Sequence, residues 1–414
     1  MKRSLARATL KSGLVFLGTN LGFIRFLWLM LLIFLFSACI AYADAGVVEE
    51  VQKEAEPVNV IINPGFEADD APVSGVDPSM GQRVQEALDA AVAEFKVPGA
   101  VLGIRDMDGN TRFWTNGTAD LKSGKPMSKD LYFRIGSVTK SYTATMVLQL
   151  VDEGKISLDD PIGKHLPGLV PKENEITIRH LLEMRSGLGS YGTNEEFAKM
   201  AEAQPGRVWT PEELIRLSSS TIADPGRNFD YNNANYILLG MLIEKVTNDS
   251  FRNQVIKRIL QPLGMSHTFV PTDMEMPAPF AHGYLVEDGK VVDGTDCLHP
   301  TAAWSAGNII STAGDQLTWA KALVEGRLLS PQVNAERFIM SPMVNKPGLY
   351  GLGVLNLDGI IGHGGNYSNA YTSFVGRHGG YDFVILVNGM IRDIEAGDFR
   401  ALSIIQKLTE ETGL

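Results

Sequence analysis

The stretch Ser137-Val138-Thr139-Lys140 places a hydroxyl and an amine three positions apart at the start of a predicted helix. Apolar residues recur at helical spacing after it as far as Gly154, which is typical of a helix end. Residues three apart lie on the same side of a helix, so both side chains can share one pocket. Burial lowers the pKa of a lysine, and a neutral amine can take the proton of a serine hydroxyl. The stretch therefore predicts a serine nucleophile activated by a lysine.

The four residues alone also allow a simpler interpretation. Ser137 would cap the helix and Lys140 would lie in solvent on its first turn. A Ser-x-x-Lys match is expected roughly once by chance in a chain of this length, and this chain has one. Other motifs along the chain must therefore decide whether Ser137 and Lys140 are catalytic or only cap and decorate the helix.

Two further short motifs follow along the chain. Tyr231 and Asn233 lie in a loop before an apolar run, so both can point into one cleft. His363 and Gly365 follow a strand-like segment, where glycines allow a close backbone approach. Each motif is weak alone, because residues 367–369 also match Tyr-x-Asn and both aromatic side chains fit ordinary packing roles.

Taken in order, Ser-x-x-Lys, Tyr-x-Asn and His-x-Gly resemble the motif set of the serine β-lactamase and penicillin-binding-protein superfamily. The resemblance is to the class C-like branch, which includes secreted D-alanyl-D-alanine carboxypeptidases, D-aminopeptidases and esterases. It runs from about residue 80 to the C-terminus and includes the stretches 176–188, 260–268, 304–312 and 350–353. It implies a β-lactamase/transpeptidase-like fold and acyl transfer through a covalent serine intermediate.

The resemblance also implies a role for each motif residue. Ser137 would be the nucleophile, and Lys140 and Tyr231 would share the general-base work. Asn233 would hold Lys140 and the substrate amide by hydrogen bonds. His363 would lie across the cleft near Tyr231 and tune its acidity.

A tetrahedral oxyanion needs two donors aimed at it. The resemblance places these donors at the backbone N–H groups of Ser137 and of Asn366, which follows Gly365 on the third-motif strand. Gly365 belongs to the same predicted substrate and oxyanion site. No cofactor and no metal ion is implied, and the seven histidines show no His-Glu-x-x-His spacing.

The fold class is predicted from the distribution of elements. Strand patterns occupy residues 79–136 and about 291–414, whereas residues from about 137 to 290 are mostly helical. We expect an α+β (mixed α/β) fold, with an antiparallel sheet built from both chain ends, flanked by N- and C-terminal helices and carrying a mostly helical insertion. Within the last third, we expect a strand over Tyr350–Leu357 and a helix over Glu395–Leu408.

Two segments precede this hydrolase domain of residues 79–414. Residues 1–43 are basic and apolar, contain no acidic residue and end in Ala41-Tyr42-Ala43. They predict a signal peptide cleaved after Ala43, hence an exported protein in the periplasm or secreted. An uncleaved membrane anchor and lipid attachment at Cys39 remain as alternatives. Residues 44–78 are acidic and proline-containing, and predict a disordered linker.

The net charge of the chain limits its possible binding partners, and its cysteine content limits its possible disulfide bonds. The net charge of −11 becomes more negative without residues 1–43, which argues against nucleic acid and anionic membrane surfaces as partners. Membrane attachment would then depend on the N-terminal segment alone. Cys297 is the one cysteine beyond that segment, so we expect no internal disulfide. The expected partner is a small-molecule or peptide substrate.

The substrate class is less sharply indicated. The motifs favour a D-alanyl-D-alanine carboxypeptidase- or β-lactamase-like hydrolase acting on a small amide or peptide. However, no Lys or Arg occurs between Lys346 and Arg377, and Gly364 occupies the place of a hydroxyl residue that would bind a substrate carboxylate. An esterase or other acyl hydrolase of uncharged substrates is therefore an alternative. A non-catalytic binder of a cell-wall fragment is another.

Overall fold

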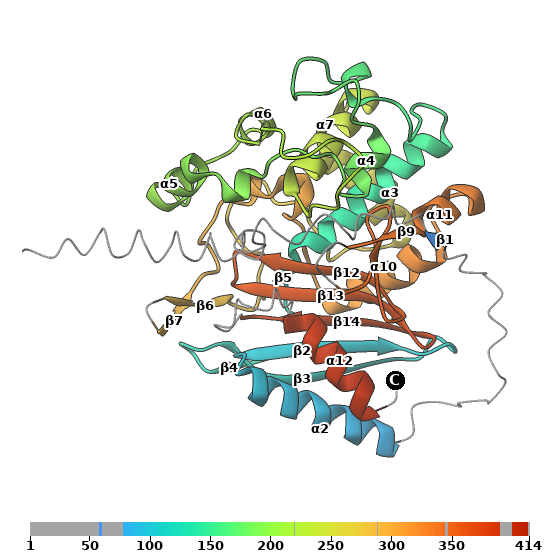
Figure 1. Cartoon of the computed structure of the whole chain (residues 1–414). Coiled ribbons are helices and arrows are strands. Elements are labelled where there is room, and N and C mark those ends of the chain that lie inside the picture. The colour runs from blue at the N-terminus through green and yellow to red at the C-terminus, as the bar shows by residue number, and fades with distance from the viewer. Residues whose placement is uncertain are drawn as a thin grey trace, which may run out of the picture. The chain divides into compact units, whose positions relative to one another are not determined.

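The computed structural model describes residues 58–59, 78–218, 220–287, 289–343, 347–389 and 400–412. Its centre is an antiparallel sheet with helices on both faces (Figure 1). In spatial order the strands are β1 (Val58–Asn59), β9 (Ile339–Pro342), β10 (Leu349–Tyr350), β11 (Leu355–Leu357), β12 (Ile360–Tyr367), β13 (Tyr371–His378), β14 (Tyr381–Val387), β2 (Gly99–Arg105), β3 (Thr111–Asp120) and β4 (Lys125–Pro126). Two short pairs lie outside it, β5 (Phe133–Arg134) with β8 (Ile310–Ser311) and β6 (Tyr284–Glu287) with β7 (Lys290–Asp293).

Helices fill the middle of the sequence and close both ends of the described chain. The α-helices are α2 (Pro78–Phe95), α3 (Thr139–Asp152), α4 (Ile178–Leu182), α5 (Glu195–Ala203), α6 (Pro211–Arg216), α7 (Asn233–Thr247), α8 (Phe251–Val255), α9 (Gln261–Leu263), α10 (Ala313–Glu325), α11 (Pro331–Arg337) and α12 (Arg400–Thr412). Short helical turns occur at η1 (Gly136–Val138), η2 (Ile162–Lys164), η3 (Tyr191–Thr193), η4 (Ile256–Leu260), η5 (Pro300–Ala302) and η6 (Trp304–Ala306).

The two faces of the sheet bury different helices because side chains alternate along a strand. On β2, Leu102 and Ile104 lie beside Ile405 of α12. The position between them, Gly103, faces Leu317 of α10, since a Cβ added there would come within 3.0 Å of that side chain. The terminal helices α2 and α12 thus cover one face and α10 covers the other, as Figure 1 shows.

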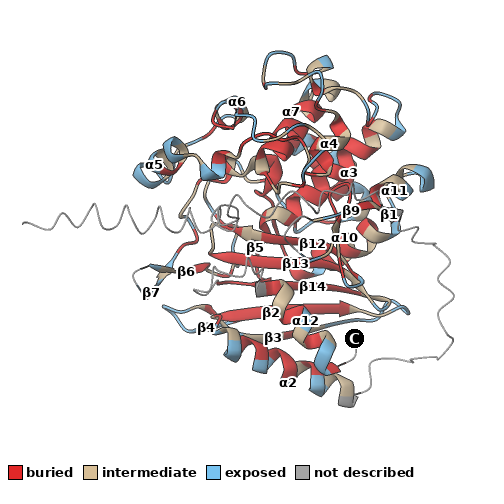
Figure 2. Ribbon diagram, in the orientation of Figure 1, coloured by how far each residue is buried: buried red, intermediate tan, exposed pale blue. Residues whose placement is uncertain are grey.

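The first and last parts of the domain meet in the middle of the sheet. Strand β14 pairs with β2 from Asp382 opposite Arg105 to Val387 opposite Ala100. Both strands are almost wholly buried (Figure 2). The predicted α+β class, with a sheet built from both chain ends and flanked by terminal helices, is confirmed.

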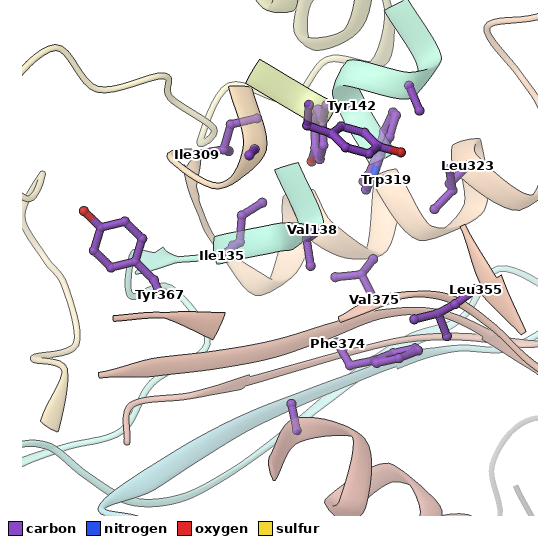
Figure 3. Packing of buried hydrophobic residues seen from close by; sticks show 14 of the residues in the cluster. Ile135, Val138, Tyr142, Ile309, Trp319, Leu323, Leu355, Tyr367, Phe374 and Val375 are labelled. Atoms are coloured by element: carbon purple, nitrogen blue, oxygen red, sulfur yellow. The ribbon is translucent and has the colours of Figure 1, made fainter. Parts of the chain in front are cut away.

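Helix α3 is the buried axis of the helical part. Eleven of its residues are buried, including the polar Thr139, Ser141 and Thr145. Tyr142 stacks on Trp319 of α10 with a ring-centroid distance of 4.0 Å, above the sheet residues Phe374 and Val375 (Figure 3). This packing fixes the N-terminal end of α3 against the sheet.

The structure changes several expected boundaries. The predicted strand Tyr350–Leu357 is wrong, because Gly353 adopts a φ of +76° and the chain reverses between β10 and β11, which pair with each other. The described part of the final helix is Arg400–Thr412, so it extends beyond the predicted end at Leu408; the predicted start at Glu395 lies outside the described residues. The expected border at about residue 291 falls inside the β6–β7 hairpin.

The N-terminal predictions are largely outside the described residues. Residues 1–43, the predicted signal peptide with its anchor and Cys39 alternatives, are not among them. Within the predicted linker, Val58–Asn59 form β1, which pairs with Ile339 and Met340 of β9, and Pro78 already belongs to α2. Over the described ranges, no helix has the length and apolar character needed to cross a membrane.

Candidate active site

Ser137 lies where a short helical turn is pressed against the sheet. Gly136 has a φ of +52°, and a Cβ at this position would come within 2.6 Å of the backbone of Asn366 on β12. The preceding Ile135 is fixed by hydrogen bonds, donating its N–H to Ile309 and accepting at its carbonyl from the Ser373 hydroxyl. Ser137 stays half-buried between buried neighbours. Its side chain caps neither η1 nor α3, so the capping interpretation does not apply.

Lys140 is completely buried beneath this serine. Its Nζ lies 2.8 Å from each of three oxygens, the hydroxyl of Ser137, the side-chain carbonyl of Asn233 and the backbone carbonyl of Ala306. Burial holds the pKa of this amine well below its usual value. The two carbonyls can only accept, so a neutral amine satisfies them with its two N–H groups and turns its lone pair towards the hydroxyl. The arrangement suits removal of the Ser137 proton.

The start of α7 and the loop before it place two side chains, Asn233 and Tyr231, beside Ser137 and Lys140. Asn232 caps α7 by accepting from the N–H of Ala234, and its amide donates to the carbonyls of Leu188 and Gly189 at 2.8 Å each. These bonds fix the backbone on both sides of Asn232. Asn233 therefore reaches Lys140, and the ring centroid of Tyr231 lies 5.0 Å from Lys140 Nζ.

The phenol of Tyr231 is buried and keeps its proton. Desolvation raises the pKa of Tyr231 strongly, and the nearby Ser137 hydroxyl lowers it by a smaller amount. The phenol oxygen makes no direct hydrogen bond in the described structure, although it lies close enough to Ser137 for this influence. A protonated phenol cannot begin as a base, but it can relay a proton between Ser137 and a leaving group.

His363 lies on β12 with 1% of its surface exposed. Its Nδ1 is 2.6 Å from the carbonyl oxygen of Gly364 and its Nε2 is 3.0 Å from the hydroxyl of Tyr350. Burial and the neighbouring Lys140 lower the pKa of His363 to about 3. The ring lies beside that of Tyr231, at 6.4 Å between centroids, but its hydrogen bond goes to Tyr350. His363 thus lies near Tyr231, as the resemblance implies, and the contact between them is made by the rings.

Gly365, the glycine of the third motif, allows β12 to lie directly on the turn that carries Ser137. A Cβ on Gly365 would come within 2.0 Å of the Ile135 carbonyl, so a side chain there would push the strand away. The next residue, Asn366, has its side chain tied to Asn369 and its backbone against Gly136. The backbones of Ser137 and Asn366 are thus brought together, as an oxyanion site requires.

The predicted residues form one constellation with different kinds of contact. Ser137, Lys140 and Asn233 are hydrogen-bonded, Tyr231 and His363 join through their rings, and Gly365 and Asn366 join through the backbone. Sequence reasoning missed the Ala306 carbonyl, the Tyr350 hydroxyl and the Asn232 amide. Of these, Asn232 had a readable signal, since asparagine directly before a helix is a preferred N-cap. Over the described ranges, no three His, Cys, Asp or Glu side chains gather as a metal site would require.

Solved structures of known proteins share this fold. A D-stereospecific amidohydrolase from Streptomyces sp. is 34% identical, with a TM-score of 0.70 over 80% of this chain and 97% of that one. A D-amino acid amidase from Ochrobactrum anthropi SV3, complexed with D-phenylalanine, is 28% identical, with a TM-score of 0.72 over 81% of this chain and 99% of that one.

Curated sequences give the same relationship over shorter stretches. Penicillin-binding protein 4 of Amycolatopsis lactamdurans is 30% identical over 250 residues, covering 57% of this chain and 62% of that protein. Esterase EstB of Burkholderia gladioli is 31% identical over 235 residues, covering 54% and 60%. The chain therefore spans about three fifths of these curated relatives. The profile of the beta-lactamase family matches residues 84–405, which is most of the described domain. This chain belongs to the beta-lactamase family.

Proposed function

We propose that this protein is a serine hydrolase that forms an acyl-enzyme on Ser137. The observation that carries the proposal is the environment of Lys140, a fully buried amine with one hydroxyl and two carbonyls as partners. A buried lysine without a carboxylate beside it is driven to its neutral form, which is the form a general base needs. A lysine with no catalytic role on the first turn of a helix would instead extend its charged ammonium group into solvent.

The reaction follows from these contacts in two halves. Lys140 takes the Ser137 proton as the serine oxygen bonds to the substrate carbonyl carbon, and the oxyanion faces the N–H groups of Ser137 and Asn366. The C–N or C–O bond then breaks, and the proton reaches the leaving amine or alcohol through the Tyr231 phenol. A water molecule next cleaves the serine ester, which releases the acid and restores both hydroxyl and amine.

For the substrate, we propose a small amide of a D-amino acid with no carboxylate next to the scissile bond. The strand that faces the nucleophile supports this choice, since β12 contains no Lys or Arg and offers Gly364 where a hydroxyl would help to hold a carboxylate. The nearest arginine on β13, Arg377, is occupied by Glu325 and Asp382. The amidohydrolase and amidase likeness, which covers nearly the whole of those two chains, favours amides over other small acyl compounds.

A second candidate function is the hydrolysis of uncharged esters. The same lack of charge on β12 favours it, together with the likeness to esterase EstB. Esters need less help at the leaving group than amides do, because an alcohol leaves more readily than an amine. A comparison of both bond types on one acyl group separates the two candidates.

Intact-mass spectrometry of the full chain with a serine-acylating fluorophosphonate probe tests the proposal. One probe mass should be added to the wild type and none to Ser137→Ala, which should also lose turnover by about 10⁴-fold or more. Ser330→Ala is the matched control, since that exposed serine caps α11 and should leave labelling unchanged. Labelling of Ser137→Ala would contradict the assignment. Spectra of the protein purified after expression with residues 1–43 also show whether the mature chain begins after Ala43, as a cleaved signal peptide would require.

A substrate panel then addresses specificity. D-phenylalanine amide should be hydrolysed faster than L-phenylalanine amide and faster than an N-acyl-D-alanyl-D-alanine peptide, and an ester of D-phenylalanine reports the other bond type on the same acyl group. Hydrolysis of the ester without measurable hydrolysis of the amide would favour the second candidate. A preference for the peptide would show that the uncharged strand does not govern substrate choice.

A further inference from the structure

The protonation of both ring nitrogens of His363 can be assigned from their partners. The Gly364 carbonyl at 2.6 Å from Nδ1 can only accept, so Nδ1 carries a proton and donates it. The ring is neutral because of its burial, so Nε2 has no proton and must accept. Its partner at 3.0 Å is the hydroxyl of Tyr350, which is therefore the donor.

Tyr350 also contacts the catalytic phenol. Its ring stands perpendicular to that of Tyr231, with 6.3 Å between centroids and an interplanar angle of 88°. It makes an edge contact with His363 at 5.9 Å and packs against Phe229 at 5.5 Å. One side chain thus contacts both aromatic groups of the site.

The backbone around Tyr350 leaves it little freedom to move. A Cβ on Gly351 would come within 2.3 Å of the Arg337 carbonyl, and a Cβ on Gly353 would come within 2.3 Å of Ala144 on α3. The chain after Tyr350 is therefore clamped between α11 and the helix that carries Lys140. The ring itself is 1% exposed.

We propose that Tyr350 is a positioning residue of the acyl-transfer site, which holds His363 in the neutral Nδ1–H form and fixes the Tyr231 ring beside Ser137. The inference rests on the proposed function of Ser137 and Lys140. Tyr350 touches neither substrate nor reacting atoms in this role, and it acts through the two rings that do lie at the site.

Neutrality of His363 matters because of what surrounds it. The titratable or charged groups around it are Lys140 from α3, Tyr231 before α7 and Tyr350 from β10, while its partner across the sheet is Val375. Lys140 becomes positive when it accepts the serine proton. A positive His363 would oppose that step, so a hydroxyl that donates to Nε2 and keeps the ring neutral favours it.

The experiment combines kinetics with nitrogen NMR on the full chain. Tyr350→Phe should lower kcat about tenfold or more with little change in KM, since it disturbs geometry and not substrate contacts. Tyr371→Phe is the control, because that equally buried tyrosine donates to the Ala281 carbonyl away from His363. An unchanged kcat in Tyr350→Phe, or an equal loss in both variants, overturns the proposal.

Histidine ¹⁵N spectra give a readout that does not depend on turnover. In the wild type, the His363 signal, assigned with His363→Gln, should show a protonated Nδ1 and a bare Nε2 that does not titrate near pH 6. In Tyr350→Phe its titration should move upward. A wild-type spectrum with a protonated Nε2 overturns the proposal even if Tyr350→Phe fails to fold. Failure of the proposed function would appear separately, as an absence of probe on Ser137.

Discussion

Two buried basic side chains, Lys140 and Arg337, are associated with helix α3, one near its N-terminal end and one near its middle. Lys140 lies at the N-terminal end of α3 with Ser137, Asn233 and Ala306 as partners. Arg337 reaches the middle of α3, where it donates to the hydroxyl of Thr145 and to the Leu323 carbonyl. Neither has an ion pair with a carboxylate among the described residues. In both regions the protein buries a basic group among neutral acceptors.

The difference between the two regions lies in the chemistry of the basic groups. Burial takes the pKa of Lys140 well below its usual value, whereas the pKa of Arg337 falls only to about 10. At neutral pH the lysine can therefore be discharged, and the arginine cannot. The same burial gives a base in one place and a fixed structural charge in the other.

Exchanging the two side-chain types gives the largest expected effect. Lys140→Arg puts a permanent charge under Ser137 and should lower kcat/KM by about 10²–10⁴-fold, because the general base is lost. Arg337→Lys should leave turnover close to that of the wild type and reduce the free energy of unfolding by about 1–3 kcal/mol, through the broken bond to Thr145. Steady-state kinetics measures kcat/KM of both variants, and urea unfolding measures their free energies of unfolding. Equal loss of turnover in both folded variants would break the distinction.

The two ends of α3 offer a second contrast, with a smaller expected effect. Gly136 and Gly154 both have a positive φ, but a Cβ meets the Asn366 backbone at 2.6 Å in the first case and nothing within 4 Å in the second. Gly136→Ala should therefore lower kcat by about 10²-fold, as loss of one oxyanion donor does. Gly154→Ala should cost only the strain of a left-handed alanine, about 1–2 kcal/mol of stability, with the rate kept. A normal rate in Gly136→Ala would show that contact with Asn366 is not needed.

The smallest expected difference between Lys140 and Arg337 is in how each affects the pH dependence of the free energy of unfolding. The pKa of Lys140 is lower in the folded than in the unfolded chain, so the unfolded chain binds the extra proton and stability rises with pH up to the unfolded value. Between about pH 8 and 10, wild type should gain about 1.4 kcal/mol per pH unit relative to Lys140→Met. Arg337→Met should show no such difference up to about pH 9, because the folded-state pKa of Arg337 is about 10 and the guanidinium is still charged below that pH. Parallel curves for wild type and Lys140→Met would mean that Lys140 is charged in the folded protein.

These contrasts also show what could be predicted from the sequence. Ser137, Lys140 and Asn233 carry their chemistry in side chains with recognisable spacing, so their meeting could be expected from motifs. The third partner of Lys140 is the backbone carbonyl of Ala306, which any residue could supply and which therefore leaves no mark in the sequence. The contact between Tyr350 and His363 could not be predicted from the sequence for a different reason. It meets His363 only because Gly353 turns the chain back on itself, where alternation of apolar residues predicted one continuous strand.

The pairing of β14 with β2 also bears on how the protein is made. Strand β2 pairs with β3, which follows it directly, and with β14, which comes much later in the sequence, and long-range pairing of the second kind is slow to form. The turn that carries Ser137 takes support from β12 and β13, which belong to the same late portion. A chain that has not yet formed β12 and β13 thus lacks the support of the turn that carries Ser137. If Ser137 acts as proposed, its activity therefore depends on late strands of the sheet, so the fold ties the site to completion of that sheet.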